Sequence, residues 1–167
     1  MNGLTRARYL TGGVAFAVLG IMLWIGQVHV APVTPDRWMP QAQVFGYSDA
    51  ELTSFARAVT AAGLDGLYTM SNRWLDGVFA IVFGFWTALM LWPRRVLALS
   101  LGALYTITDL AENHRLLALF EAARDPAYVP ASGSALGLAG YLTVQKFLAL
   151  AFIVGAIGYS RLKGPAR

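Results

Sequence analysis

The sequence predicts an all-helical integral membrane protein, built as a single domain over residues 1–167. Apolar residues make up 57% of the chain, whereas soluble domains average roughly 45–50%. Charged residues make up only 13%, which is too few to cover the surface of a soluble protein of this size. Four apolar segments reach the ~20 residues that a helix needs to cross the hydrocarbon core. We therefore expect an antiparallel bundle of four transmembrane helices, with one amphipathic helix on the outer side.

The four expected spans cover about residues 9–30, 72–92, 96–120 and 136–159. Trp74 and Trp92 bracket the second span, as aromatic residues do at membrane interfaces, and Pro93 ends it. The first span also resembles a cleaved signal peptide, because Arg6 and Arg8 precede an apolar run. That run is longer than a usual signal core and no A-x-A site follows it, so we expect a membrane anchor.

Basic residues are distributed unevenly between the two sides of these spans. One side carries cations without acids: Arg6, Arg8, Arg94, Arg95, Arg161, Lys163 and Arg167. The other side mixes both signs: Arg37, Arg57, Arg124, Asp36, Asp49, Glu51, Asp65, Glu121 and Asp125. The positive-inside rule then directs both termini and the turn at residues 93–95 to the cytoplasm. We therefore expect a multi-pass protein of the bacterial inner membrane.

The outer connection of residues 31–71 is long enough to hold structure of its own. It opens with a Pro-rich stretch that we expect to be extended: Pro32, Pro35 and Pro40. A helix should follow over about residues 49–62, because Ser48 and Glu51 form a capping-box pattern and Gly63 supplies a stop. Its apolar residues recur on one face: Leu52, Phe55, Ala56, Val59 and Ala62. Such a helix could lie flat on the membrane or cover the outer mouth of the bundle, and a packed connector is the plainer interpretation.

Small residues spaced three or four apart indicate where helices can approach each other closely. One row lies in the first span: Gly13, Ala17 and Gly20. A second row lies where the fourth span begins: Gly133, Gly137 and Gly140. Each row could pack within the chain or against a second copy, and packing within the chain is the plainer interpretation.

Ionisable residues inside the spans are the main functional clue. Helical spacing puts Asp109, Glu112 and Asn113 on one face of the third span, while the second and fourth spans carry Asp76 and Lys146. A helix rises 1.5 Å per residue, so the four charged groups lie about 20–24 Å from the cytoplasmic ends of their spans. Charges at such depth are costly and usually face the interior and pair with one another. We therefore expect these five residues to form a ligand- or ion-binding site in the outer half of the bilayer.

The charge balance of this polar layer is compatible with proton binding or acid–base catalysis. Three carboxylates share it with one lysine, and crowding in a low dielectric favours retention of a proton by at least one acid. A retained proton suits a relay, a proton-coupled site or acid–base catalysis, although no catalytic residue can be assigned. In this interpretation Asp109 and Glu112 bind a cation or proton, Asn113 orients them, Asp76 faces them and Lys146 balances the charge. The alternative is a structural layer, in which buried pairs fix the helix register.

Several other functions are excluded by the composition and motifs. The chain has no cysteine, which excludes disulfides, Cys-ligated zinc, iron–sulfur clusters and thiol catalysis. His29 and His114 lack metal-ligand spacing, so no metal site is expected. No nucleotide-binding or nucleophile motif occurs in a suitable context, so no cofactor is predicted. Scattered cations without interleaved aromatics argue against nucleic acid, which leaves membrane lipids, a second copy or another membrane protein as expected partners.

An ordered set of motifs resembles an uncharacterised family of bacterial four-span inner-membrane proteins. The motifs are Gly46-Tyr47-Ser48 at the outer helix, Leu75-Asp76 in the second span, and Asp109-Leu110-Ala111-Glu112-Asn113 in the third. The similarity covers about residues 43–120. It implies four spans, a G-Y-S outer helix and an intramembrane D-x-x-E-N motif, but no activity. Gly66-Leu67-Tyr68 departs from the Gly-Arg-x-Tyr that the family would have here.

Two functions therefore remain open from the sequence. The first is binding, transport or modification of a small, ionic or lipidic substrate at the polar layer. The second is an accessory or assembly subunit of a larger membrane complex, which the small size, the glycine rows and the lack of a nucleophile motif favour. Substitutions that remove charge while keeping shape separate the two, because only a binding site has a ligand to lose.

Overall fold

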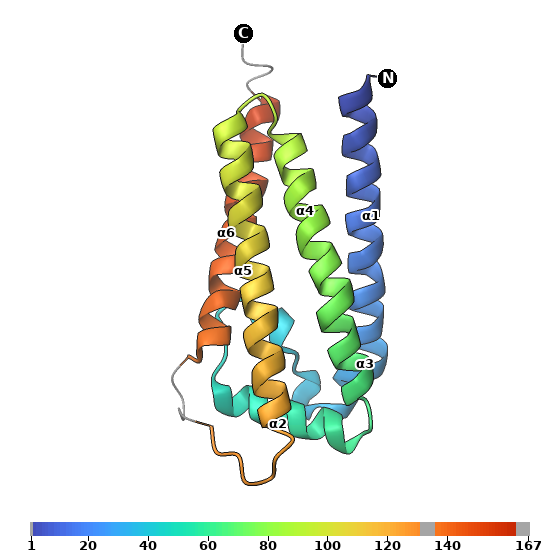
Figure 1. The fold of residues 1–167 in the computed structure, drawn as a ribbon, viewed down its shortest axis with the longest axis vertical. Helices are drawn as coiled ribbons and strands as arrows, with labels where there is room; N and C mark the ends of the chain where they lie inside the picture. The colour runs from blue at the N-terminus through green and yellow to red at the C-terminus, as the bar shows by residue number, and fades with distance from the viewer. Residues whose placement is uncertain (1, 131–135, 163–167) are drawn as a thin grey trace.

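The computed structural model describes residues 2–130 and 136–162, which are almost entirely helical (Figure 1). The long helices run along one common axis: α1 (Gly3–Ile25), α4 (Gly77–Met90), α5 (Arg95–Ala122) and α6 (Leu138–Leu162). A further helix, α2 (Asp49–Ala61), lies across one end of them (Figure 1). The described residues contain no β-strand, only an isolated bridge between Ser48 and Leu136. The prediction of an all-helical fold is confirmed.

Three helical stretches of the described residues are long and apolar enough to cross a membrane: Gly3–Val33, Asp65–Met90 and Leu138–Leu162. These lengths and compositions are those of a membrane protein. Helix α5 has 28 residues but is not among the three. The residues that make it less apolar include Asp109, Glu112 and Asn113, and all three are buried within the protein.

Two of the long helices begin or end in a π-helical turn. Helix α3 (Asp65–Met70) continues through the π turn η5 (Ser71–Asp76) into α4, so this helical stretch begins at Asp65 rather than near Asn72 as expected. Helix α1 continues through a second π turn, η1 (Gly26–Val30). Turns of π-helix are rare and often occur at functional sites. Both of these turns lie beside one cavity, described below, which marks that cavity as a candidate site.

Helix α2 has the ends that its sequence predicts. The Ser48 side chain accepts a hydrogen bond from Glu51 N at 3.2 Å, and the Glu51 carboxylate accepts one from Ser48 N at 2.7 Å. Gly63 follows the helix with a φ of +71°, as a stop residue does. The apolar face packs against α5 and is buried at Leu52, Phe55, Ala56 and Val59. Ala62 is exposed instead, because the helix already ends at Ala61.

The Pro-rich stretch before α2 is not extended, and that expectation is wrong. It forms three short 3-10 turns: η2 (Ala31–Val33), η3 (Pro35–Arg37) and η4 (Pro40–Ala42). Each turn has a proline at its first or second position, where the fixed φ of proline suits a helical start. The turns fold this stretch back over the helix ends and bring Met39 against Gly26.

The G-Y-S segment docks against the beginning of α6. Gly46 adopts a φ of +79°, and Gly137 N donates a hydrogen bond to Tyr47 O at 3.1 Å. A Cβ atom on Gly140 would collide with the backbone of Tyr47, so this close approach requires glycine. Gly137 and Gly140 therefore pack within the chain, whereas Gly133 lies outside the described residues.

The small-residue row of α1 faces away from the other helices. Gly13, Ala17 and Gly20 are exposed, and nothing lies within 4 Å of a Cβ atom built on either glycine. The expectation that this row packs within the chain is therefore wrong. Helix α1 is rotated so that Gly12, and not Gly13, faces the other helices. A Cβ atom on Gly12 would lie 2.7 Å from Trp86 Nε1.

Candidate functional site

Lys146 lies at the centre of a buried ionic cluster. Its Nζ is 3.1 Å from Asp109 Oδ1 and also forms an ion pair with Glu112 Oε2. Both acids come from α5, about one turn apart, and are almost wholly buried. Helical spacing explains why they reach one partner together. Two carboxylates thus share a single ammonium group contributed by α6.

Glu112 lies behind Lys146, away from the cavity described below. Thr143 Oγ1 donates a hydrogen bond to Glu112 Oε1 at 2.6 Å, and Thr143 precedes Lys146 by three residues on α6. The Tyr47 side chain reaches the same region from the G-Y-S segment. Burial, followed by the nearby charge of Glu112, raises the pKa of Tyr47, so its hydroxyl stays protonated near neutral pH. Glu112 therefore holds Lys146 in position.

Asp76 faces the cluster from the end of η5. It is 3% exposed and lies within electrostatic reach of Asp109 and Lys146. Asp76 Oδ2 and Asp109 Oδ2 have no hydrogen-bond partner among the described residues. Buried polar atoms normally have such a partner, so these two carboxylate oxygens are exceptions within the described part of the chain.

Asn113 lies beside Asp76 but opens to a different side of the protein. It lines a separate pocket on the α4–α5 surface, of about 360 Å³, together with Arg73, His114 and Glu121. Arg73 and His114 are exposed, and Asn113 Nδ2 has no hydrogen-bond partner in the described part of the chain. Asn113 is thus separated from the side of the cluster that holds Lys146.

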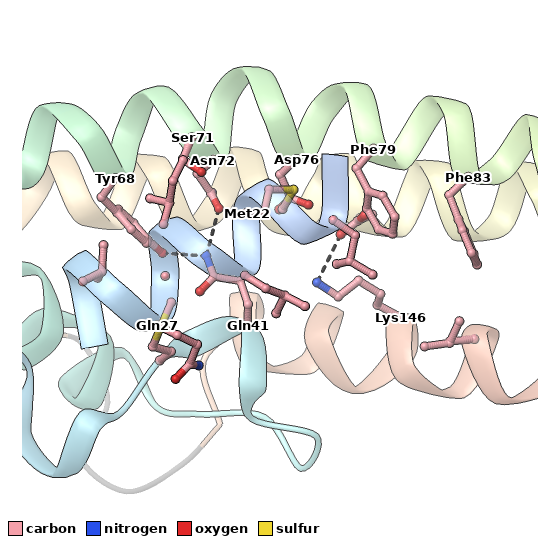
Figure 2. A pocket seen from close by; sticks show the side chains of 18 of the residues that line it. Met22, Gln27, Gln41, Tyr68, Ser71, Asn72, Asp76, Phe79, Phe83 and Lys146 are labelled. Atoms are coloured by element: carbon pink, nitrogen blue, oxygen red, sulfur yellow. Dashed lines mark hydrogen bonds and ion pairs between the residues drawn. The ribbon is translucent and has the colours of Figure 1, made fainter. Parts of the chain in front are cut away.

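The ionic cluster opens into a cavity of about 350 Å³ (Figure 2). Asp76, Asp109 and Lys146 are the charged side chains among the described residues that line it. The remaining wall is mostly apolar and includes Phe16, Leu19, Met22, Phe79, Phe83 and Leu150. Figure 2 shows Lys146 reaching from α6 toward α4 and α5, with Asp76 and Phe79 on the opposite wall. Both π turns contribute to the lining, η1 through Gln27 and η5 through Asn72 and Asp76.

Gln41 lines the part of the cavity nearest α2. Its Nε2 donates hydrogen bonds to Tyr68 OH and Asn72 Oδ1, both at 2.9 Å (Figure 2). Met39 completes this wall, where a Cβ atom on Gly26 would lie 2.9 Å from Met39 Cε. The sequence offers no spacing signal for Gln41, because its partners lie 27 and 31 residues away along the chain.

Comparisons with known proteins give no match for this chain. No family model matches it. No curated protein and no solved structure matches it either. Within residues 2–130 and 136–162 there is also no group of three or more side chains arranged to hold a metal ion. The arrangement of the cluster and its cavity is therefore the basis for assigning a function.

Proposed function

We propose that the protein crosses the bacterial inner membrane four times as an antiparallel bundle, with both termini in the cytoplasm. The beginning of α1, the end of α6 and the α4–α5 turn lie at the same end of the helices, opposite α2 (Figure 1). That end carries the cation-rich positions Arg6, Arg8, Arg94, Arg95 and Arg161, an asymmetry that supports a cytoplasmic orientation. Helix α5 is the fourth span in this proposal, because its length suffices and its central acids are buried against α6.

We further propose that the ionic cluster and its cavity bind a small, ionic or lipidic substrate within the membrane. The observation that carries this proposal is the pair of unpartnered carboxylate oxygens, from Asp76 and Asp109, on two residues that line the cavity. A cluster that only fixed helix register would have its polar atoms satisfied within the protein. Asp76 and Asp109 contact the substrate, Lys146 balances their charge, and Glu112 positions Lys146.

Asp76→Asn tests this function, because Asp76 forms no ion pair in the described residues and the change keeps its shape. We expect the variant to express and unfold like the wild type but to lose the small molecule that co-purifies with the wild-type protein, as identified by mass spectrometry. Asp36→Asn is the matched control, since Asp36 is an exposed carboxylate outside the cluster. Loss of expression or thermal stability in Asp76→Asn, or an unchanged bound molecule, contradicts the proposal.

The second candidate function is an accessory subunit of a larger membrane complex. The outward-facing row of Gly13, Ala17 and Gly20 on α1 favours it, because small residues let a neighbouring helix approach closely. In that case cross-linking in membranes captures a partner protein through α1, and Gly13→Leu prevents the cross-link. The binding proposal expects no effect of Gly13→Leu on the bound small molecule.

A further inference from the structure

The cavity has a side that faces the surroundings of the helices, between α1 and α6. Helix α1 packs against α4, and α6 packs against α5, but α1 and α6 are not among the helix pairs in close contact. Both nevertheless line the same cavity, α1 through Phe16 and Leu23 and α6 through Phe147. Phe16 and Leu23 are each 55% exposed, so the side chains that bound the cavity here also face outward. In a membrane protein, this side of the cavity meets lipid.

Side chains from other elements line both ends of the cavity. Gln41 and Met39 cover the end nearest α2. Toward the other end, a buried apolar cluster that includes Phe83, Tyr105 and Ile153 fills the space between the helices. A ligand that reaches the cavity without displacing these groups passes between α1 and α6.

The wall of the cavity has a charged zone and an apolar zone. A charged zone holds Asp76, Asp109 and Lys146, with Glu112 directly behind. Three carboxylates and one ammonium leave a formal excess of negative charge, and the two free oxygens are acceptors. The second zone of the wall is apolar and includes Leu19 and Phe83. A ligand that satisfies both zones combines a donor group with a hydrocarbon chain.

We propose that the cavity binds a single-chain amphiphile with an amine head group, which enters from the membrane between α1 and α6. The ammonium head of the ligand contacts Asp76 and Asp109. Its hydrocarbon chain lies along α1 and Phe83 and extends toward the lipid. Charge complementarity selects an amine over a carboxylate or phosphate head, because an anion would meet unpaired acids in a medium of low dielectric. The inference rests on the proposed function and specifies its substrate class.

Native mass spectrometry of the full chain in dodecyl maltoside tests this inference with three probes: dodecylamine, dodecanoate and propylamine. We expect dodecylamine to bind at least about tenfold more tightly than either of the others, because only it matches both zones. Asp76→Asn should weaken dodecylamine binding by about tenfold. It should also reduce the difference in affinity between dodecylamine and dodecanoate.

Leu150→Trp tests whether the ligand binds in the cavity, since Leu150 lines the cavity from α6 and a larger side chain would fill it. It should abolish dodecylamine binding, whereas Leu148→Trp, two residues away and 56% exposed, should not. Leu23→Trp tests the lateral route, because it narrows the opening from α1 at a residue that is more than half exposed. It also provides a second variant if Leu150→Trp does not fold.

The outcomes separate this inference from the proposed function. Equal binding of propylamine and dodecylamine that Leu150→Trp abolishes and Leu23→Trp leaves unchanged means a water-soluble ligand. The site then stands and the amphiphile inference falls. Equal binding of dodecanoate and dodecylamine overturns the choice of an amine. Wild-type protein that binds none of the three probes and carries no co-purified molecule overturns the inference and the proposed function together.

Discussion

At the scale of single residues, the ionic cluster depends on Lys146. Its ammonium pairs with Asp109 and Glu112, so removing it leaves two buried carboxylates without their partner. Losing one member of a buried pair typically costs about 3–5 kcal/mol. We therefore expect Lys146→Met to lower the free energy of unfolding by about that amount, measured as a fall in the thermal unfolding midpoint in detergent.

Two further variants determine whether charge, rather than side-chain packing, is responsible for this loss. Adding Glu112→Gln to Lys146→Met should recover part of the stability, because one of the unpaired charges is then removed. Arg115→Met is the control, since Arg115 is an exposed cation on α5 with no ion pair in the described residues. A Lys146→Met protein as stable as the Arg115→Met protein would show that the cluster does not support the fold.

Residue counting along helices accounts for part of this cluster. The rise of a helix fixes height, so the sequence alone brings Asp109, Glu112 and Lys146 to a common level, and the structure pairs them. Rotation of α5 about its own axis is not fixed in this way. It decides that Asp109 lines the cavity, that Glu112 lies behind Lys146, and that Asn113 turns to the α4–α5 surface.

At the scale of elements, the G-Y-S segment and α6 meet at a junction with little free space. The backbone of Tyr47 lies directly against Gly140, and backbone cannot move aside as a flexible side chain can. Gly140→Ala should therefore lower stability by about 1–3 kcal/mol through overpacking, seen as a lower thermal midpoint. It should also displace Tyr47 from the region of Glu112 and Thr143.

Gly13→Ala is the matched control for this junction, because the same methyl group on α1 meets nothing within 4 Å. Its thermal midpoint should equal or exceed that of the wild type, since alanine favours helix more than glycine does. If Gly140→Ala and Gly13→Ala behave alike, the close approach at α6 does not contribute to stability.

Elements with local signals follow their sequence more closely than elements shaped by distant contacts. The capping box and Gly63 define α2 to within a residue, because those interactions are made within the helix and its ends. The Pro-rich stretch differs from its expected form because η4 is held by Gln41 bonded to Tyr68 and Asn72. Such contacts between distant segments leave no periodicity in the sequence.

At the scale of the whole molecule, the number of membrane crossings depends on α5. Composition identifies three helical stretches as apolar enough to cross, and α5 differs from them by its buried polar residues. If α5 also crosses, the α4–α5 turn and the end of α5 lie on opposite sides of the membrane. Hydropathy averages over all faces of a helix, so it underrates one whose polar residues are turned inward.

The absence of cysteine in the chain permits a direct test of this topology by single-cysteine labelling. Ser54→Cys in α2 and Val129→Cys beyond α5 replace exposed residues at the end nearest α2, and Gly3→Cys replaces one at the opposite end. An impermeant maleimide applied to intact spheroplasts should label Ser54→Cys and Val129→Cys, and should reach Gly3→Cys only after lysis. Val129→Cys decides the role of α5, because protection equal to that of Gly3→Cys would mean that α5 does not cross. The ionic cluster would then lie outside a four-span bundle, and access from lipid between α1 and α6 would lose its basis.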